Sequence, residues 1–187
     1  MGPRRDPFVL AVCALGITQI TAWGTGYYCL GVLAGPIARD TGWSLSLVYF
    51  GFTVSLLAMG AVSAPAGRAI DRYGAQAVMC AGTVLESAGL LILSRVTTEA
   101  GWLGAWAFLG VGMRLCLYDA AFAALVQVVP SRARQAISAL TLFGAFASTV
   151  FWVLAHYLDA ALGWRATLAW FAAINLVVCL PLNWVGL

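Results

Sequence analysis

Three ionisable side chains lie inside apolar stretches of the chain, where nothing nearby in the sequence solvates them. The segment GVGMRLCLYDAAF, residues 110–122, contains Arg114 and Asp119, and a second apolar run contains Glu86. A charge at the centre of a bilayer costs about 2.5–3.5 kcal/mol on insertion scales, so such a residue faces protein or a watery pathway. These side chains are therefore the first candidates for binding an ionic solute or for moving a proton.

The composition predicts the elements that carry them. Of 187 residues, 63% are hydrophobic and 9% are charged, whereas about a quarter of the residues in a soluble domain are charged. Each run between charges reaches the roughly 20 residues that a helix needs to cross a bilayer. We therefore expect an all-α membrane protein with one domain, residues 1–187. The expected spans are residues 8–34, 44–66, 75–94, 102–129, 136–158 and 165–186.

Several classes of protein and site are excluded at this point. The first run is longer than the apolar region of a signal peptide, about 7–15 residues, so we interpret it as a retained helix. The five cysteines all lie within expected spans and form no CxxC pattern, which predicts neither a disulfide framework nor a metal site. We expect no cofactor, and the net charge of +3 reports membrane topology rather than a nucleic-acid partner.

The arginines in short loops predict the orientation. Six of them are expected on one side of the membrane, namely Arg4, Arg5, Arg68, Arg72, Arg132 and Arg134. Three are expected on the other side, namely Arg39, Arg95 and Arg165. This bias places the amino terminus in the cytoplasm. A Gly-Trp pair at 42–43, 101–102 and 163–164 precedes each helix that starts from the outer face, which predicts tryptophan anchors at the headgroup level and two repeats of three helices.

The helical geometry separates Arg114 from Asp119. Five positions correspond to about 140° around a helix and an axial offset of about 7.5 Å, whereas a pair on one face needs a spacing of three or four. We therefore expect one charge to face a pathway and the other to face the bundle. Glu86 is a candidate neutralising partner, and both Asp119 and Glu86 are candidates for proton coupling.

The candidate solute contacts lie on the first and fourth expected spans. Arg114 either presents its guanidinium to a substrate carboxylate or is held in a structural ion pair by Glu86 or Asp119, and Tyr118 shares its face. On the first span, Gln19 and Tyr27 share a face that can line a pathway. The glycines of that span are expected to serve close helix packing.

A short glycine- and charge-rich segment, PAGRAIDRYGAQ (residues 65–76), follows the second expected span. Its glycines permit a sharp reversal of the chain. The segment resembles the G-x-x-x-D-R-x-G-[RK]-[RK] loop between helices two and three of the major facilitator superfamily. The residues that match are Gly67, Asp71, Arg72 and Gly74, whereas Ala75 and Gln76 replace the two basic positions.

The resemblance covers the whole chain in its layout of spans. It implies the amino-terminal half-bundle of a major facilitator fold, with this loop helping to lock two six-helix halves together on the cytoplasmic side. The aspartate of the loop would then face a helix end of the opposite half. That half is expected from a longer version of the same chain, or alternatively from a homodimer.

A weaker resemblance concerns the substrate. The stretch GYYCLGVLAGPIARDTGWSLSLV, residues 26–48, is similar to bacterial relatives of the monocarboxylate and oxalate–formate porters. The Gly-Pro pattern that marks helix five of drug–proton antiporters is missing from residues 139–158.

We therefore expect secondary active transport of a small organic anion by alternating access, in a bacterial inner membrane. The alternatives are multidrug or other-solute efflux and a six-helix structural or regulatory protein without transport. An intramembrane enzyme is not expected, because the chain has no G-x-S-G serine turn and no paired zinc ligands.

Overall fold

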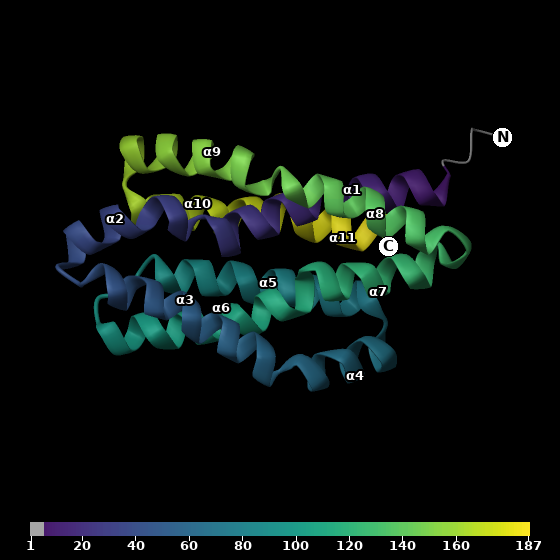
Figure 1. Cartoon of the computed structure of the whole chain (residues 1–187), viewed down its shortest axis with the longest axis horizontal. Coiled ribbons are helices and arrows are strands. Elements are labelled where there is room, and N and C mark those ends of the chain that lie inside the picture. The colour runs from purple at the N-terminus through teal and green to yellow at the C-terminus, as the bar shows by residue number, and fades with distance from the viewer. Residues whose placement is uncertain (1–5) are drawn as a thin grey trace.

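The computed structural model describes residues 6–187 as a bundle of long helices (Figure 1). The expected cytoplasmic arginines Arg4 and Arg5 lie outside the described residues. The elements of the first half are α1 (Pro7–Ala22), the π-helical η1 (Trp23–Tyr28), α2 (Leu30–Thr41), α3 (Leu45–Ala61), α4 (Ser63–Tyr73) and α5 (Ala75–Leu93). Those of the second half are α6 (Glu99–Cys116), α7 (Tyr118–Val128), η2 (Pro130–Arg132), α8 (Ala133–Ala145), α9 (Ala147–Leu162), α10 (Trp164–Ile174), the π-helical η3 (Asn175–Cys179) and α11 (Leu180–Gly186).

These elements form the expected membrane-spanning helices. Five stretches within residues 6–187 are long and apolar enough to cross a bilayer, namely 7–41, 75–93, 99–128, 130–162 and 164–186. A sixth is formed by α3 and α4 when this pair, bent by 52°, is counted as one span. The prediction of an all-α membrane protein is confirmed.

The first span is longer than the residue composition indicated. Its helix passes through Pro36 and continues to Thr41, seven residues beyond the expected end at Ala34. Gly42 ends it in the left-handed conformation, with φ of 74°, and its N–H donates to the carbonyl of Ala38. A glycine at this position is the usual helix terminator, so Gly42 rather than Pro36 determines the end.

The helices divide into two groups of three spans (Figure 1). The spans of α3–α4, α5 and α6–α7 pack together, and so do those of α1–α2, α8–α9 and α10–α11. If the six spans are numbered along the chain, exchanging span one with four, two with five and three with six converts one group into the other. The structure therefore has the internal symmetry expected of two three-helix repeats.

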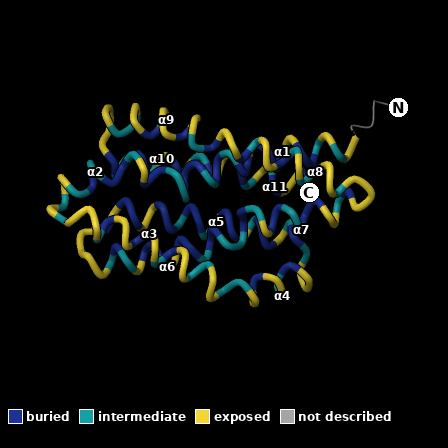
Figure 2. Tube along the Cα trace, in the orientation of Figure 1, coloured by how far each residue is buried: buried dark blue, intermediate teal, exposed yellow. Residues whose placement is uncertain are grey.

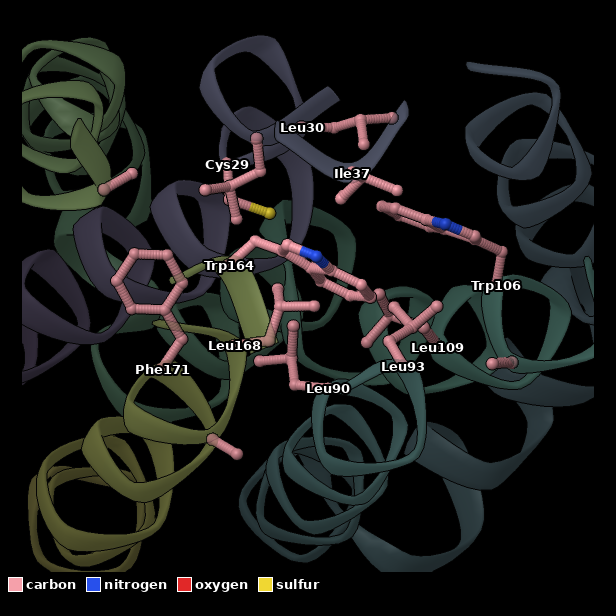
Figure 3. Packing of buried hydrophobic residues seen from close by; sticks show 14 of the residues in the cluster. Cys29, Leu30, Ile37, Leu90, Leu93, Trp106, Leu109, Trp164, Leu168 and Phe171 are labelled. Atoms are coloured by element: carbon pink, nitrogen blue, oxygen red, sulfur yellow. The ribbon is translucent and has the colours of Figure 1, made fainter. Parts of the chain in front are cut away.

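Two ends of the bundle are defined by the turns found there. The Gly42 end carries the turns at Gly42 and Gly163, and the Gly74 end carries the turn at Gly74 and the short helix η2 (Figure 1). An apolar core fills each end. The core at the Gly42 end includes Leu30, Leu90 and Phe171 (Figure 3). The core at the Gly74 end includes Leu15, Met79 and Leu125.

Between the two apolar cores lies a layer of buried polar side chains, which we call the polar layer. Along each helix, its members lie between residues of one apolar core and residues of the other. They are Thr18, Gln19, Thr21, Thr25, Thr83, Glu86, Ser87, Asn175 and Asn183. The helix α5, buried along much of its length (Figure 2), contributes three of them.

The Gly-Trp pairs do not anchor the chain at a headgroup level. Trp102 is fully buried and Trp164 nearly so. The Trp102 ring centroid lies 5.8 Å from that of Trp43 and 6.4 Å from that of Trp164. The three tryptophans therefore pack on one another and join three helix starts. The expectation of lipid anchoring was therefore wrong for Trp102 and Trp164, whose rings are covered by protein, whereas Trp43 is half-buried.

Candidate functional site

The fourth span is interrupted in its middle, at Leu117. This residue separates α6 from α7 with φ of −80° and ψ of −164°, an extended conformation. Its N–H still donates to the carbonyl of Met113, at 3.0 Å. The interruption, which we call the Leu117 break, lies at the depth of the polar layer.

The Leu117 break changes the relation between the two charges on this span. A guanidinium nitrogen of Arg114 and a carboxylate oxygen of Asp119 form an ion pair across the break. We expected no such pair, because an uninterrupted helix would separate the two residues by about 140°. That expectation was wrong, since the extended residue between them breaks the helical spacing.

The two partners differ in exposure. The Arg114 side chain is 22% exposed and its Nε has no hydrogen-bond partner among the described residues. The Asp119 side chain is 63% exposed. The arginine is thus held by the protein, whereas its carboxylate partner is largely free to leave.

Gln19 of α1 holds the break in place. Its Nε2 donates to the carbonyl of Cys116, the last residue of α6, at 2.8 Å. A carbonyl at a helix end lacks an intrahelical partner, so this bond stabilises the interruption. Gln19 is fully buried inside the bundle, and its contact with a solute stays a prediction.

A pocket of about 240 Å³ joins the ion pair to the glycine- and charge-rich segment. Arg114 and Asp119 line one side of it, and Gly67 and Asp71 of α4 line another. The pocket thus contains one guanidinium and two carboxylates. Both groups of residues were candidates from the sequence, but the sequence did not predict that they share a pocket.

The segment itself is helical, not a loop. Gly67, Asp71 and Arg72 all lie within α4, and the chain reverses only at Gly74, with φ of 82° and ψ of 152°. This conformation is open almost only to glycine. The expectation of a loop was wrong, because Arg68, Ala69 and Arg72 between Gly67 and Gly74 favour a helix. Arg72 is exposed and its guanidinium lies 5.2 Å from the centroid of the Tyr73 ring.

Aromatic side chains of three spans form a continuous, partly exposed cluster. Trp23 of η1 lies 4.9 Å from Tyr27 and 5.0 Å from Tyr118 of α7, between ring centroids. Tyr118 stacks on Phe122 at 5.1 Å, and Tyr27 contacts Phe52 of α3 at 4.8 Å. Tyr27 and Tyr118 were candidates from the sequence. Phe52 and Phe122 were missed, because an aromatic residue in an apolar span has no distinguishing pattern.

Glu86 lies apart from this pocket, inside the polar layer. It is fully buried, and its Oε2 accepts a hydrogen bond from the Cys116 thiol at 3.0 Å. Neither Arg114 nor any other cation of the described residues forms an ion pair with it. Of the two partners expected for a structural pair with Arg114, the structure therefore has Asp119 and not Glu86.

Comparisons with known proteins agree with this architecture. The model of the Major Facilitator Superfamily matches residues 7–187. The multidrug resistance protein MdtL of Citrobacter koseri is 26% identical over 170 residues, which are 90% of this chain and 43% of that protein. The chain therefore spans less than half the length of this relative. Because the family model covers nearly every residue, including the Leu117 break and the pocket beside it, the chain belongs to the Major Facilitator Superfamily.

Proposed function

We propose that this chain forms one six-helix half of a secondary transporter that moves a small organic anion by alternating access. Membership of the superfamily supports transport of a small solute across a membrane. The observation that carries the choice of an anion is the exchangeable partner of Arg114. A guanidinium that is mostly buried and paired with a mostly exposed carboxylate can accept a solute carboxylate in its place.

The exchange has a simple physical basis. Arginine binds a carboxylate through two parallel N–H donors, and the energy of a partly exposed ion pair is small, about 0–1 kcal/mol. A solute carboxylate that takes the place of Asp119 therefore has to break only a weak ion pair. The released Asp119 carboxylate faces the pocket that it shares with Asp71, where a second negative charge disfavours it.

This step links solute binding to the segment of α4. Once Asp119 leaves Arg114, the carboxylates of Asp119 and Asp71 repel each other in the pocket. This repulsion favours movement of α4 away from α7. In the proposed cycle Gly67, Asp71, Arg72 and Gly74 thus form the gate on the cytoplasmic side, and the amino terminus lies in the cytoplasm of a bacterial cell. The partner is a second six-helix half, from a longer chain or a second copy.

Export of aromatic compounds is a second candidate function. The cluster of Trp23, Tyr27, Tyr118 and Phe52 offers stacking surfaces for a flat apolar solute. The name of the relative from Citrobacter koseri, a multidrug resistance protein, agrees with such a solute.

Transport assays distinguish the two. The full-length protein in proteoliposomes is tested for counterflow of labelled small carboxylates and, separately, of a fluorescent aromatic cation. The proposal predicts carboxylate counterflow that is lost in Arg114→Gln and kept in Tyr27→Phe. Transport of the aromatic cation that is insensitive to Arg114→Gln would instead support the second candidate.

A further inference from the structure

We propose that Glu86 is a proton-binding site inside this half-bundle, and that its charge is transmitted through Cys116 to the Leu117 break. The site is separate from the pocket of Arg114 and faces no part of it. Its existence does not depend on the transport function proposed above, whereas its consequence for solute binding does.

The site is built by close approach of three helices. A Cβ atom added to Gly26 of η1 would overlap Oε1 of Glu86, and one added to Gly112 of α6 would lie 2.5 Å from the Glu86 backbone nitrogen. These two glycines allow η1 and α6 to come this near to Glu86. Glu86 is thus enclosed between them, at 0% exposure.

Among residues 6–187, the surroundings of Glu86 contain thiols and no cation paired with it. Cys116 of α6 donates to its Oε2, and the nearby Cys29 and Cys179 come from the start of α2 and from η3. The charged groups of the packed helices point elsewhere. Arg114 pairs with Asp119, and Arg165 of α10 lies 3.7 Å from Asp40.

The polar layer around Glu86 has more acceptors than protein donors. Four of its buried side-chain oxygens have no hydrogen-bond partner among residues 6–187, namely Gln19 Oε1, Glu86 Oε1, Asn175 Oδ1 and Asn183 Oδ1. A proton on Glu86 turns one acceptor into a donor and removes a charge that no cation balances. Ionisable residues placed in this way within a membrane span are the usual sites of proton binding.

Cys116 connects this site to the break. It is the last residue of α6, its thiol contacts Glu86, and its carbonyl accepts the bond from Gln19. When the proton leaves Glu86 for the aqueous phase, the O–H bond breaks and a carboxylate remains in the core. A buried charge without a cation favours states in which water reaches Glu86. In those states the helices that enclose Glu86 separate, and the contacts of Cys116 at the end of α6 open with them. Opening them loosens the Leu117 break and hence the pair of Arg114 and Asp119.

Infrared spectroscopy tests the site without any transport assay. The full-length protein in lipid is titrated with pH, and the C=O stretch of protonated carboxyl groups is recorded in H₂O and D₂O. We expect a pH-dependent band that is absent in Glu86→Gln and present in Asp119→Asn, the matched control on an exposed carboxylate. In Cys116→Ala the same band should change frequency, because its hydrogen-bond donor is removed. A spectrum unchanged by Glu86→Gln would overturn the proposal.

Hydrogen exchange tests the link to the break. The amides of residues 113–121 are compared between the unmodified protein and Glu86→Gln at the same pH, so that intrinsic exchange rates cancel. We expect equal exchange at low pH and several-fold faster exchange in the unmodified protein at high pH. Equal exchange at every pH would refute the link, and replacement of the pH effect by a sodium effect would refute the proton as the ligand.

Discussion

Arg114 and Asp119 form an ion pair across a break in their own helix, although they lie five positions apart in the sequence. The pair depends on the extended conformation of Leu117, and that conformation depends on a bond from Gln19, 97 positions away in the sequence. A side chain of the first span thus stabilises the break that brings the two charges of the fourth span together.

Removal of the Gln19 amide should loosen the break. In Gln19→Leu the carbonyl of Cys116 loses its donor, and we expect the free energy of unfolding to fall by about 1 kcal/mol, as for other buried interhelical bonds. Thermal unfolding in detergent measures the loss. The control is Tyr27→Phe, which removes a hydroxyl without a recorded bond and should leave stability nearly unchanged. Equal losses in both variants would argue against a specific role for Gln19.

The contact between α5 and α6 at Glu86 should not tolerate a methyl group. Gly112→Ala places a Cβ atom 2.5 Å from the Glu86 nitrogen, and such overpacking costs about 1–3 kcal/mol. Gly104 lies on the same helix with nothing within 4 Å of an added Cβ. Gly104→Ala should therefore be neutral or stabilising by up to about 1 kcal/mol. The midpoint of thermal unfolding should fall in Gly112→Ala and stay the same or rise in Gly104→Ala. A fall of equal size in both variants would contradict the close packing.

Substitution by alanine should also have opposite effects on stability at the two motif glycines, Gly67 and Gly74. Gly74 adopts a conformation that costs other residues about 1–3 kcal/mol, so Gly74→Ala should destabilise the turn between α4 and α5. Gly67 lies within α4 with open space around it, and Gly67→Ala should stabilise that helix. Limited proteolysis at residues 70–76 reports on the turn. Greater cleavage of Gly67→Ala than of Gly74→Ala would show that α4 is not the helix described.

Much of the architecture could be predicted from the sequence. Long apolar runs separated by charges indicated the helices, and the spacing of Gly67, Asp71, Arg72 and Gly74 indicated the family, which the family model confirms. Both signals are local, because a run of hydrophobic residues or a short motif is complete within its own segment.

The arrangement of the candidate site could not be predicted in this way. No glycine or proline lies at the Leu117 break to indicate it, and the bond that stabilises it comes from a distant helix. For the same reason the sequence left the partner of Arg114 open between Glu86 and Asp119. Asp71 lines the same pocket as this pair because α4 is bent by 52° relative to α3. Helix packing, and not a local sequence pattern, determines this bend.

The exchange of Asp119 for a solute carboxylate at Arg114 is the central claim, and competition measures it directly. Binding of small carboxylates to the full-length protein is followed by thermal stabilisation or calorimetry in the unmodified protein, in Asp119→Asn and in Arg114→Gln. Because Asp119 competes with the solute for Arg114, we predict that Asp119→Asn binds the carboxylate several-fold more tightly, whereas Arg114→Gln does not bind it. Equal weakening in both variants would contradict the account, because it would mean that the ion pair serves only to hold the helix.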